Sequence, residues 1–129
     1  MPDEKIRVLL VDDDPQHLAL VERLLGSYGI HVQTCDSALG ASKTIRHEKP
    51  DVVLLDVNME DLTGDRLLGV ARRHAPEGTQ FVLYSAHDDT RLRQLAAEVG
   101  ADGWISKSAE PDMLARAVEQ HAARKRARA

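Results

Sequence analysis

Apolar and polar positions alternate in blocks along the chain. Short apolar runs of strand length occur at Val8–Val11, Val52–Leu55 and Phe81–Tyr84, with weaker candidates at His31–Cys35 and Trp104–Ile105. A run that is apolar at every position is typical of a strand buried on both faces, as in a parallel sheet. The pattern therefore predicts five short strands, and the three strongest should lie inside the molecule.

Between these runs the apolar residues follow helical spacing. The clearest stripe is Leu92, Leu95, Ala96 and Val99, whose i, i+3, i+4, i+7 spacing puts them on one face of a helix. Similar stripes predict helices at Leu18–Leu25, Leu67–Ala71 and Leu114–His121, and a weaker one at Ser37–His47. Strand and helix thus alternate five times, which predicts an α/β fold with a doubly wound parallel sheet.

Length and charge narrow the class of protein. The chain has 129 residues, which predicts one domain over 1–129, and its formal net charge of −4 does not favour a nucleic-acid binder. A single cysteine, Cys35, excludes an internal disulfide and suits a reducing compartment. No apolar run approaches the length of a membrane span, and the first residues do not form a signal peptide. We therefore expect a cytoplasmic protein without membrane or nucleic-acid partners, whose residues 122–129 form a basic helix end or a frayed tail.

Polar side chains follow four of the five predicted strands. Asp12 and Asp13 come after the first strand and Asp56 after the third, while Ser85 ends the fourth and Lys107 follows the fifth. The carboxyl ends of parallel strands meet at one edge of a sheet, where ligands bind in such folds. Clustered carboxylates repel one another unless a cation lies among them, and Mg²⁺ prefers oxygen ligands of this kind. Together with a hydroxyl and an ammonium group, they predict a phosphoryl-transfer site in which an aspartate is the nucleophile.

Asp14 has a separate, local explanation. It precedes Pro15, and an aspartate followed by proline is typical of a helix N-cap with proline at the first helical position. We therefore assign Asp14 to capping, which leaves Asp12 and Asp13 as the metal-binding pair.

Four segments of the chain also resemble a known family. They are Val11–Pro15, Leu55–Met59 with Gly64 following, Tyr84–Asp89, and Gly100–Lys107. In this order and at strand ends, they are similar to the motifs of the receiver domain of bacterial two-component response regulators, in particular the stand-alone chemotaxis receivers. The resemblance extends from about residue 6 to about residue 121. It implies a flavodoxin-like, three-layer (βα)5 sandwich with strand order 2-1-3-4-5.

The resemblance also implies roles for the site residues. Asp56 would accept a phosphoryl group from a phosphohistidine of a histidine kinase or a histidine phosphotransfer protein. Mg²⁺ would be held by Asp12, Asp13, Asp56 and the backbone carbonyl of Asn58. Lys107 would pair with the phosphoryl oxygens. Such a chain is a signalling phospho-acceptor, and at most it catalyses its own phosphotransfer and slow dephosphorylation.

The remaining implied roles concern switching. Ser85 would donate its hydroxyl to the phosphoryl group and move toward it, and Trp104 would then change rotamer. The surface of the fourth helix, fifth strand and fifth helix would change shape and select a downstream protein in trans. Asn58 and His87 flank the acceptor at positions that tune the lifetime of the phosphoryl group.

Three positions depart from the family pattern. Ser108 stands where the family usually has a proline after a cis peptide bond, so the Lys107–Ser108 bond is either trans with a reshaped loop or strained. Glu60 replaces a proline after Met59, and Trp104 is larger than the usual Tyr or Phe. A larger ring needs more room inside, which favours a stiffer switch or an outward bias.

Two alternative functions remain open at this point. A phosphatase of the haloacid dehalogenase type also combines an aspartate nucleophile with Ser or Thr, Lys and an acidic pair, but there the nucleophile lies in an Asp-x-Asp motif that precedes the acidic pair. Here the pair comes first and Asp56 begins Asp-Val-Asn. The second alternative is a degenerate receiver that only docks to partners and is never phosphorylated.

Overall fold

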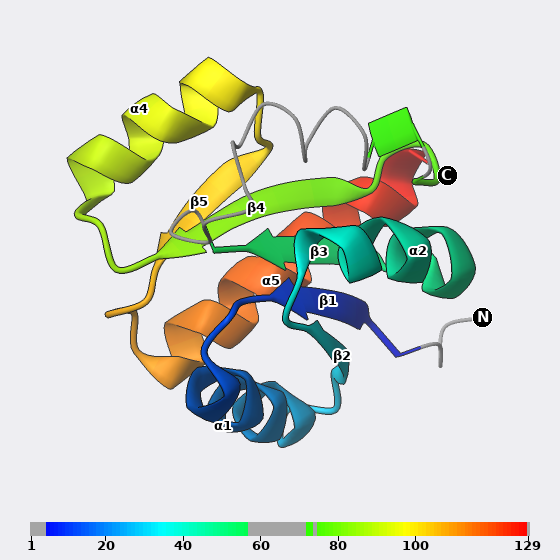
Figure 1. The fold of residues 1–129 in the computed structure, drawn as a ribbon, viewed down its shortest axis with the longest axis horizontal. Coiled ribbons are helices and arrows are strands. Elements are labelled where there is room, and N and C mark those ends of the chain that lie inside the picture. Colours follow the sequence, from blue (N-terminus) through cyan, green and yellow to red (C-terminus); the bar gives the residue numbers. More distant parts are fainter. Residues whose placement is uncertain (1–4, 57–71, 74, 129) are drawn as a thin grey trace.

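A five-stranded parallel sheet forms the centre of the molecule. The computed structural model describes residues 5–56, 72–73 and 75–128. Within this part the strand order is β2-β1-β3-β4-β5, and all neighbouring strands are parallel (Figure 1). The strands are β1 (Arg7–Val11), β2 (His31–Cys35), β3 (Val52–Leu55), β4 (Gln80–Ser85) and β5 (Gly103–Ser106). The predicted strands and their 2-1-3-4-5 order are therefore confirmed.

Helices cover both faces of the sheet. Within the described residues they are α1 (Pro15–Gly26), α2 (Ala38–Glu48), α4 (Asp89–Val99) and α5 (Pro111–Arg128). One apolar cluster joins the sheet to α1 and α5, and a second joins the opposite face to α2 and α4. This is the predicted three-layer α/β sandwich. The helix expected around Leu67, Val70 and Ala71 lies outside the described residues.

The central strands are buried on both faces because their side chains point alternately into the two clusters. In β3, Val52 and Leu54 pack on the α1–α5 side, while Val53 and Leu55 pack on the α2–α4 side. All four are at most 3% exposed. A strand with two buried faces gains nothing from polar residues, which explains why its sequence is a continuous aliphatic run.

The start of α1 follows the predicted capping pattern. The Asp14 carboxylate accepts hydrogen bonds from the backbone N–H groups of Gln16 at 3.0 Å and His17 at 3.4 Å. Pro15 occupies the first helical turn, where its missing N–H costs nothing. The capping role assigned to Asp14 is confirmed, so this carboxylate is used locally.

The C-terminal helix α5 continues through the basic segment. Lys125 and Arg126 form ion pairs with the buried carboxylate of Asp51, at 3.3 and 3.2 Å. Arg126 also donates to the backbone carbonyl of Lys5 at 3.0 Å. These contacts hold the end of α5 against the edge where the strands begin, opposite the acidic strand ends. Across the described part of the chain, no helix combines the length and the apolar character needed to cross a membrane.

Candidate functional site

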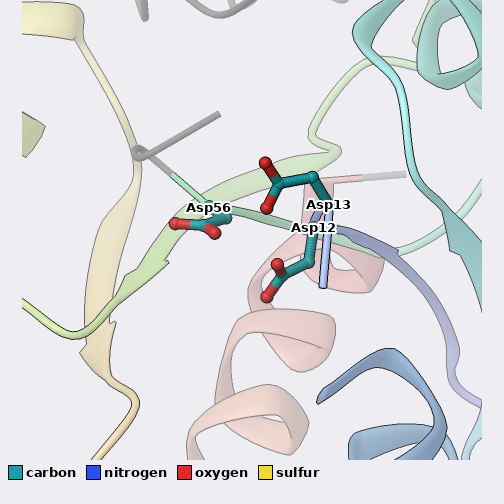
Figure 2. A group of neighbouring side chains, drawn as sticks. All are labelled: Asp12, Asp13 and Asp56. Atoms are coloured by element: carbon teal, nitrogen blue, oxygen red, sulfur yellow. The ribbon is translucent and has the colours of Figure 1, made fainter. Parts of the chain in front are cut away.

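Three carboxylates converge at the carboxyl ends of two adjacent central strands. Asp12 and Asp13 follow β1, and Asp56 follows β3 (Figure 2). Each of the three offers a carboxylate oxygen within 4.8 Å of the others. Asp12 and Asp56 are buried, at 0% and 3% exposed, whereas Asp13 is exposed to solvent. The cluster is therefore open on the side of Asp13.

Backbone pairing fixes the two buried carboxylates beyond the ends of the strands. The N–H of Asp12 donates to the carbonyl of Cys35 at 3.1 Å, and that of Asp56 donates to the carbonyl of Val11 at 2.9 Å. The Asp14 N–H then donates to Asp12 Oδ1 at 3.0 Å and orients that carboxylate. The positions of the acids therefore depend on the sheet itself.

Lys107 joins the two buried carboxylates. Its Nζ lies 2.7 Å from Asp12 Oδ2 and 3.3 Å from Asp56 Oδ2, and its side chain is 19% exposed. The Lys107 N–H donates to the Ser85 carbonyl at 2.8 Å, which anchors the loop after β5 to the end of β4. An ammonium group between two carboxylates offsets their mutual repulsion.

The electrostatics of this triad favour the charged forms of its members. Burial raises the pKa of Asp12, but the hydrogen bond and charge of Lys107 and the N–H of Asp14 outweigh burial and lower it. Burial lowers the pKa of Lys107, but the hydrogen bond and charge of Asp12, together with those of Asp56, outweigh burial and raise it. Lys107 thus holds a proton and a positive charge beside Asp56 at neutral pH.

The loop after Lys107 has a trans backbone. No cis peptide bond occurs in the described residues, so the Lys107–Ser108 bond is trans, one of the two forms considered from the sequence. The Ser108 N–H donates to Ser106 Oγ at 3.1 Å, and the two serine hydroxyls are 2.7 Å apart. This short turn brings Lys107 to both carboxylates.

The predicted switch residues lie on one face of the sheet. Trp104 of β5 pairs with Leu83 of β4, and Leu83 packs on the α4 side of the sheet. Ser85 lies two positions after Leu83 in β4, so Ser85 and Trp104 are on that same face. Ser85 is fully buried, and Trp104 is 38% exposed. His87 is exposed in the loop before α4, and Asn58 lies outside the described residues, as does Glu60.

Two aromatic residues near the site were missed by sequence reasoning. The Tyr84 ring centroid lies 5.5 Å from that of His17 and 5.9 Å from Lys107 Nζ. Burial, and then the charge of Asp12, raise the pKa of Tyr84 to about 12. Because Tyr84 ends the apolar run Phe81–Tyr84, the sequence predicted only that it packs in the core. Only the alternation of β4 signals that Tyr84 faces α1 while Ser85 faces α4.

The donor set fits a hard divalent cation. All three carboxylates are oxygen donors, and Mg²⁺ is usually held by one or two carboxylates with water and a phosphate oxygen. Asp13 is exposed and leaves room for such ligands, while Lys107 occupies the inner side of the cluster. Asp12, Asp13 and Asp56 are therefore the residues that could hold the metal ion.

Comparisons with known proteins agree with this geometry. Residues 8–119 match the family model of the response regulator receiver domain. The chain belongs to the response regulator receiver family. The match covers both predicted acids after β1, Asp56, Ser85 and Lys107.

Individual relatives show how the receiver relates to longer proteins. The transcriptional regulatory protein GlrR of Escherichia coli is 29% identical over 119 residues, which are 92% of this chain but 27% of GlrR. The BeF3-activated N-terminal receiver domain of RstA from Klebsiella pneumoniae is 28% identical, with a TM-score of 0.79 over 90% of this chain and 97% of that one. A CheY-like receiver from Methanospirillum hungatei has a TM-score of 0.84 at 23% identity, covering 98% and 100%, and supports the fold.

Proposed function

We propose that this receiver is a phospho-acceptor in a two-component phosphorelay, with Asp56 as the residue that becomes phosphorylated. The observation that carries the proposal is the position of Lys107, whose ammonium group lies 3.3 Å from the Asp56 carboxylate and 2.7 Å from that of Asp12. A positive charge held beside an acceptor carboxylate stabilises the negative charge that arrives with a phosphoryl group.

The donor in this proposal is a phosphohistidine on a histidine kinase or a histidine phosphotransfer protein. The phosphorus–nitrogen bond of the donor breaks as a phosphorus–oxygen bond to an Asp56 carboxylate oxygen forms, and the departing imidazole takes up a proton. Asp12, Asp13 and Asp56 would hold Mg²⁺, which when bound neutralises charge on the phosphoryl oxygens. The backbone carbonyl of Asn58 completes the proposed ligand set.

Ser85 and Lys107 bind the new phosphoryl group in this scheme. The backbone hydrogen bond from Lys107 to the Ser85 carbonyl, 2.8 Å long, holds the two residues next to each other. A phosphoryl group adds about −1.5 to −2 charge and three acceptor oxygens. Attraction of the Ser85 hydroxyl toward these oxygens would open space on the face that carries Trp104, with His87 and Asn58 setting the lifetime of the modification.

The output in this proposal is a protein contact through α4, β5 and α5. A partner that binds the phosphorylated shape more tightly shifts the population toward it. GlrR is named a transcriptional regulatory protein, and this chain spans about a quarter of its length. We therefore propose that this receiver acts on a protein partner in the cytoplasm. In this proposal it does not turn over a small substrate, and it does not itself contact a nucleic acid or a membrane.

The phospho-acceptor is tested by labelling with acetyl phosphate and Mg²⁺. We expect the wild type to be labelled and Asp56→Asn to be unlabelled, as measured by intact-protein mass spectrometry. Asp112→Asn removes an exposed carboxylate from the first turn of α5 and should be labelled like the wild type. Equal labelling of the wild type and Asp56→Asn would refute the assignment.

The switch is tested with beryllofluoride, a phosphoryl mimic. Trp104 is the only tryptophan, so its emission reports on this face. We expect a saturable, Mg²⁺-dependent change that Asp56→Asn abolishes and that fluoride alone does not cause. Failure to bind Mg²⁺ or the mimic would favour a receiver that only docks. Multiple turnover of a small phosphoester would instead favour the phosphatase alternative.

A further inference from the structure

A second charged feature lies at the opposite edge of the sheet, where the strands begin. A cavity of about 440 Å³ is lined there by Lys5, Arg7, Lys49, Lys125 and Arg126, with a single carboxylate, Asp51, among them. His31, the first residue of β2, completes the lining. The chain as a whole carries a net charge of −4, so the charge of this cavity is opposite in sign to that of the whole protein.

The lining residues come from four separate segments of the chain, one of which is His31. Lys5 and Arg7 lie at the start of β1, Lys49 and Asp51 lie between α2 and β3, and Lys125 and Arg126 are near the end of α5. The tertiary fold assembles them, since Arg126 contacts Asp51 across 75 positions and Lys5 across 121. The cavity is therefore a product of the fold and not a basic run in the sequence.

The single lining carboxylate is already saturated with donors. Asp51 accepts from the N–H of Arg7 at 3.0 Å and pairs with Lys125 at 3.3 Å and Arg126 at 3.2 Å, while its side chain is 7% exposed. Glu48 beside the cavity pairs with Arg7 at 2.7 Å. Five cations against these two carboxylates leave an excess of three positive charges.

Two of the lysines have donor groups to offer a ligand. No ion pair involves Lys5 or Lys49 within the described part of the chain, and both residues are exposed. Arg7 uses one terminal nitrogen on Glu48, and a guanidinium has five N–H donors in all. The cavity thus combines point charges with a planar donor, the combination that suits phosphate oxygens.

The backbone at Lys49 supports a functional interpretation. Its φ of 49° makes it the one residue other than glycine with positive φ among those described. It caps α2 through an N–H bond to the Ile45 carbonyl at 3.0 Å. Glycine or asparagine is the usual choice for this left-handed position. A lysine held there brings a charge to the cavity at a conformational cost, and such costs gather at functional sites.

From these observations we infer that the cavity binds a small anion with two adjacent phosphate groups, such as pyrophosphate or the diphosphate portion of a nucleotide. An excess of three positive charges matches a multiply charged anion better than a single carboxylate or orthophosphate. The site is separate from the acidic cluster, because β1 runs between them and spans roughly 17 Å at about 3.3 Å per residue. This inference is independent of whether Asp56 is phosphorylated.

The probe for this site is pyrophosphate, titrated into the full chain at physiological ionic strength with EDTA present. Chelation of divalent cations keeps the probe from being bridged to the acidic cluster. Binding is followed by backbone amide chemical shifts. We expect saturable shifts at His31, Lys49 and Asp51, and none at Asp12 or Lys107. Orthophosphate should bind at least about tenfold more weakly.

Matched double variants test the lining residues. Lys5→Gln with Lys49→Gln should weaken pyrophosphate binding at least about tenfold. Lys43→Gln with Arg93→Gln removes the same charge from exposed positions on α2 and α4 that do not line the cavity, and should bind like the wild type. Equal loss in both double variants, no saturable binding, shifts centred on Asp12 and Lys107, or equal affinity for orthophosphate would each overturn the inference.

Discussion

The contact between Gly103 and His121 gives a sharp test of how β5 packs on α5. A Cβ atom added at Gly103 would lie 2.7 Å from both Cε1 and Nε2 of the His121 ring. His121 is 8% exposed, and its Nδ1 is 2.9 Å from the Gln80 side-chain oxygen. Gly103→Ala therefore forces a buried, hydrogen-bonded ring to move.

The size of the effect follows from two costs. Overpacking a filled interior costs about 1–3 kcal/mol, and losing the hydrogen bond to Gln80 costs about 0.5–1.5 kcal/mol more. We expect Gly103→Ala to lower the free energy of unfolding by about 1.5–4.5 kcal/mol. The change should be measured by urea unfolding with far-ultraviolet circular dichroism, because Trp104 adjoins the mutated residue and its fluorescence would respond to local changes.

Two further variants make this prediction refutable. Gly26→Ala, at the end of α1, adds a methyl group with no atom within 4 Å, so it should be neutral or stabilise by up to about 1 kcal/mol. His121→Ala in the Gly103→Ala background removes the ring and should make the two effects clearly non-additive. A Gly103→Ala protein within about 0.5 kcal/mol of the wild type would show that the ring yields freely and that the reasoning is wrong.

Three other predictions concern stability. Burial, and then the charge of Arg124, lower the pKa of His121 despite the opposing charge of Asp102. The unfolded state therefore binds the proton more readily, and the free energy of unfolding should fall as the pH drops below the ordinary histidine value of about 6.5. His121→Gln should reduce this pH dependence in urea unfolding measured at acid pH, and an unchanged dependence would contradict the assignment. Asp51→Ala should destabilise by about 1–3 kcal/mol in thermal unfolding, because it removes the buried acceptor of the Arg7 N–H and the counter-charge of Lys125 and Arg126. Asp51→Asn keeps an acceptor for that N–H and should cost less; a loss below about 0.5 kcal/mol for Asp51→Ala would refute the prediction. Asp14→Ala should cost about 1 kcal/mol in the same assay through loss of the α1 cap, and no loss would mean that the cap is redundant.

Sequence patterns predicted those parts of the fold in which burial alone decides the residue type. Val52–Leu55 was predicted with its observed bounds because both faces of β3 are buried. β4 is longer than its apolar run, since Gln80 and Ser85 also pair in the ladder. A polar residue in the sequence can mark the end of a strand or can lie buried inside the strand. The two cases differ only in whether the side chain has a tertiary partner, as Gln80 has in His121.

The site was predicted to a similar extent. The rule that ligands bind at the carboxyl ends of parallel strands predicted from the sequence that Asp12, Asp13 and Asp56 lie close together. Lys107 reaches both buried acids from a loop whose backbone is trans, and the sequence had left the cis or trans form open. The pairing of Asp51 with the end of α5 joins residues 75 positions apart, and no local signal in the sequence marks it.

The order in which the site is assembled during synthesis follows from the Lys107 bridge. The three acids lie within the first 56 residues, so they are synthesised well before Lys107. The ammonium group that balances them comes 95 positions after Asp12. Until β5 has left the ribosome, the nascent chain carries these carboxylates without their internal counter-charge. The cluster therefore reaches its balanced state only when translation of the receiver is nearly finished.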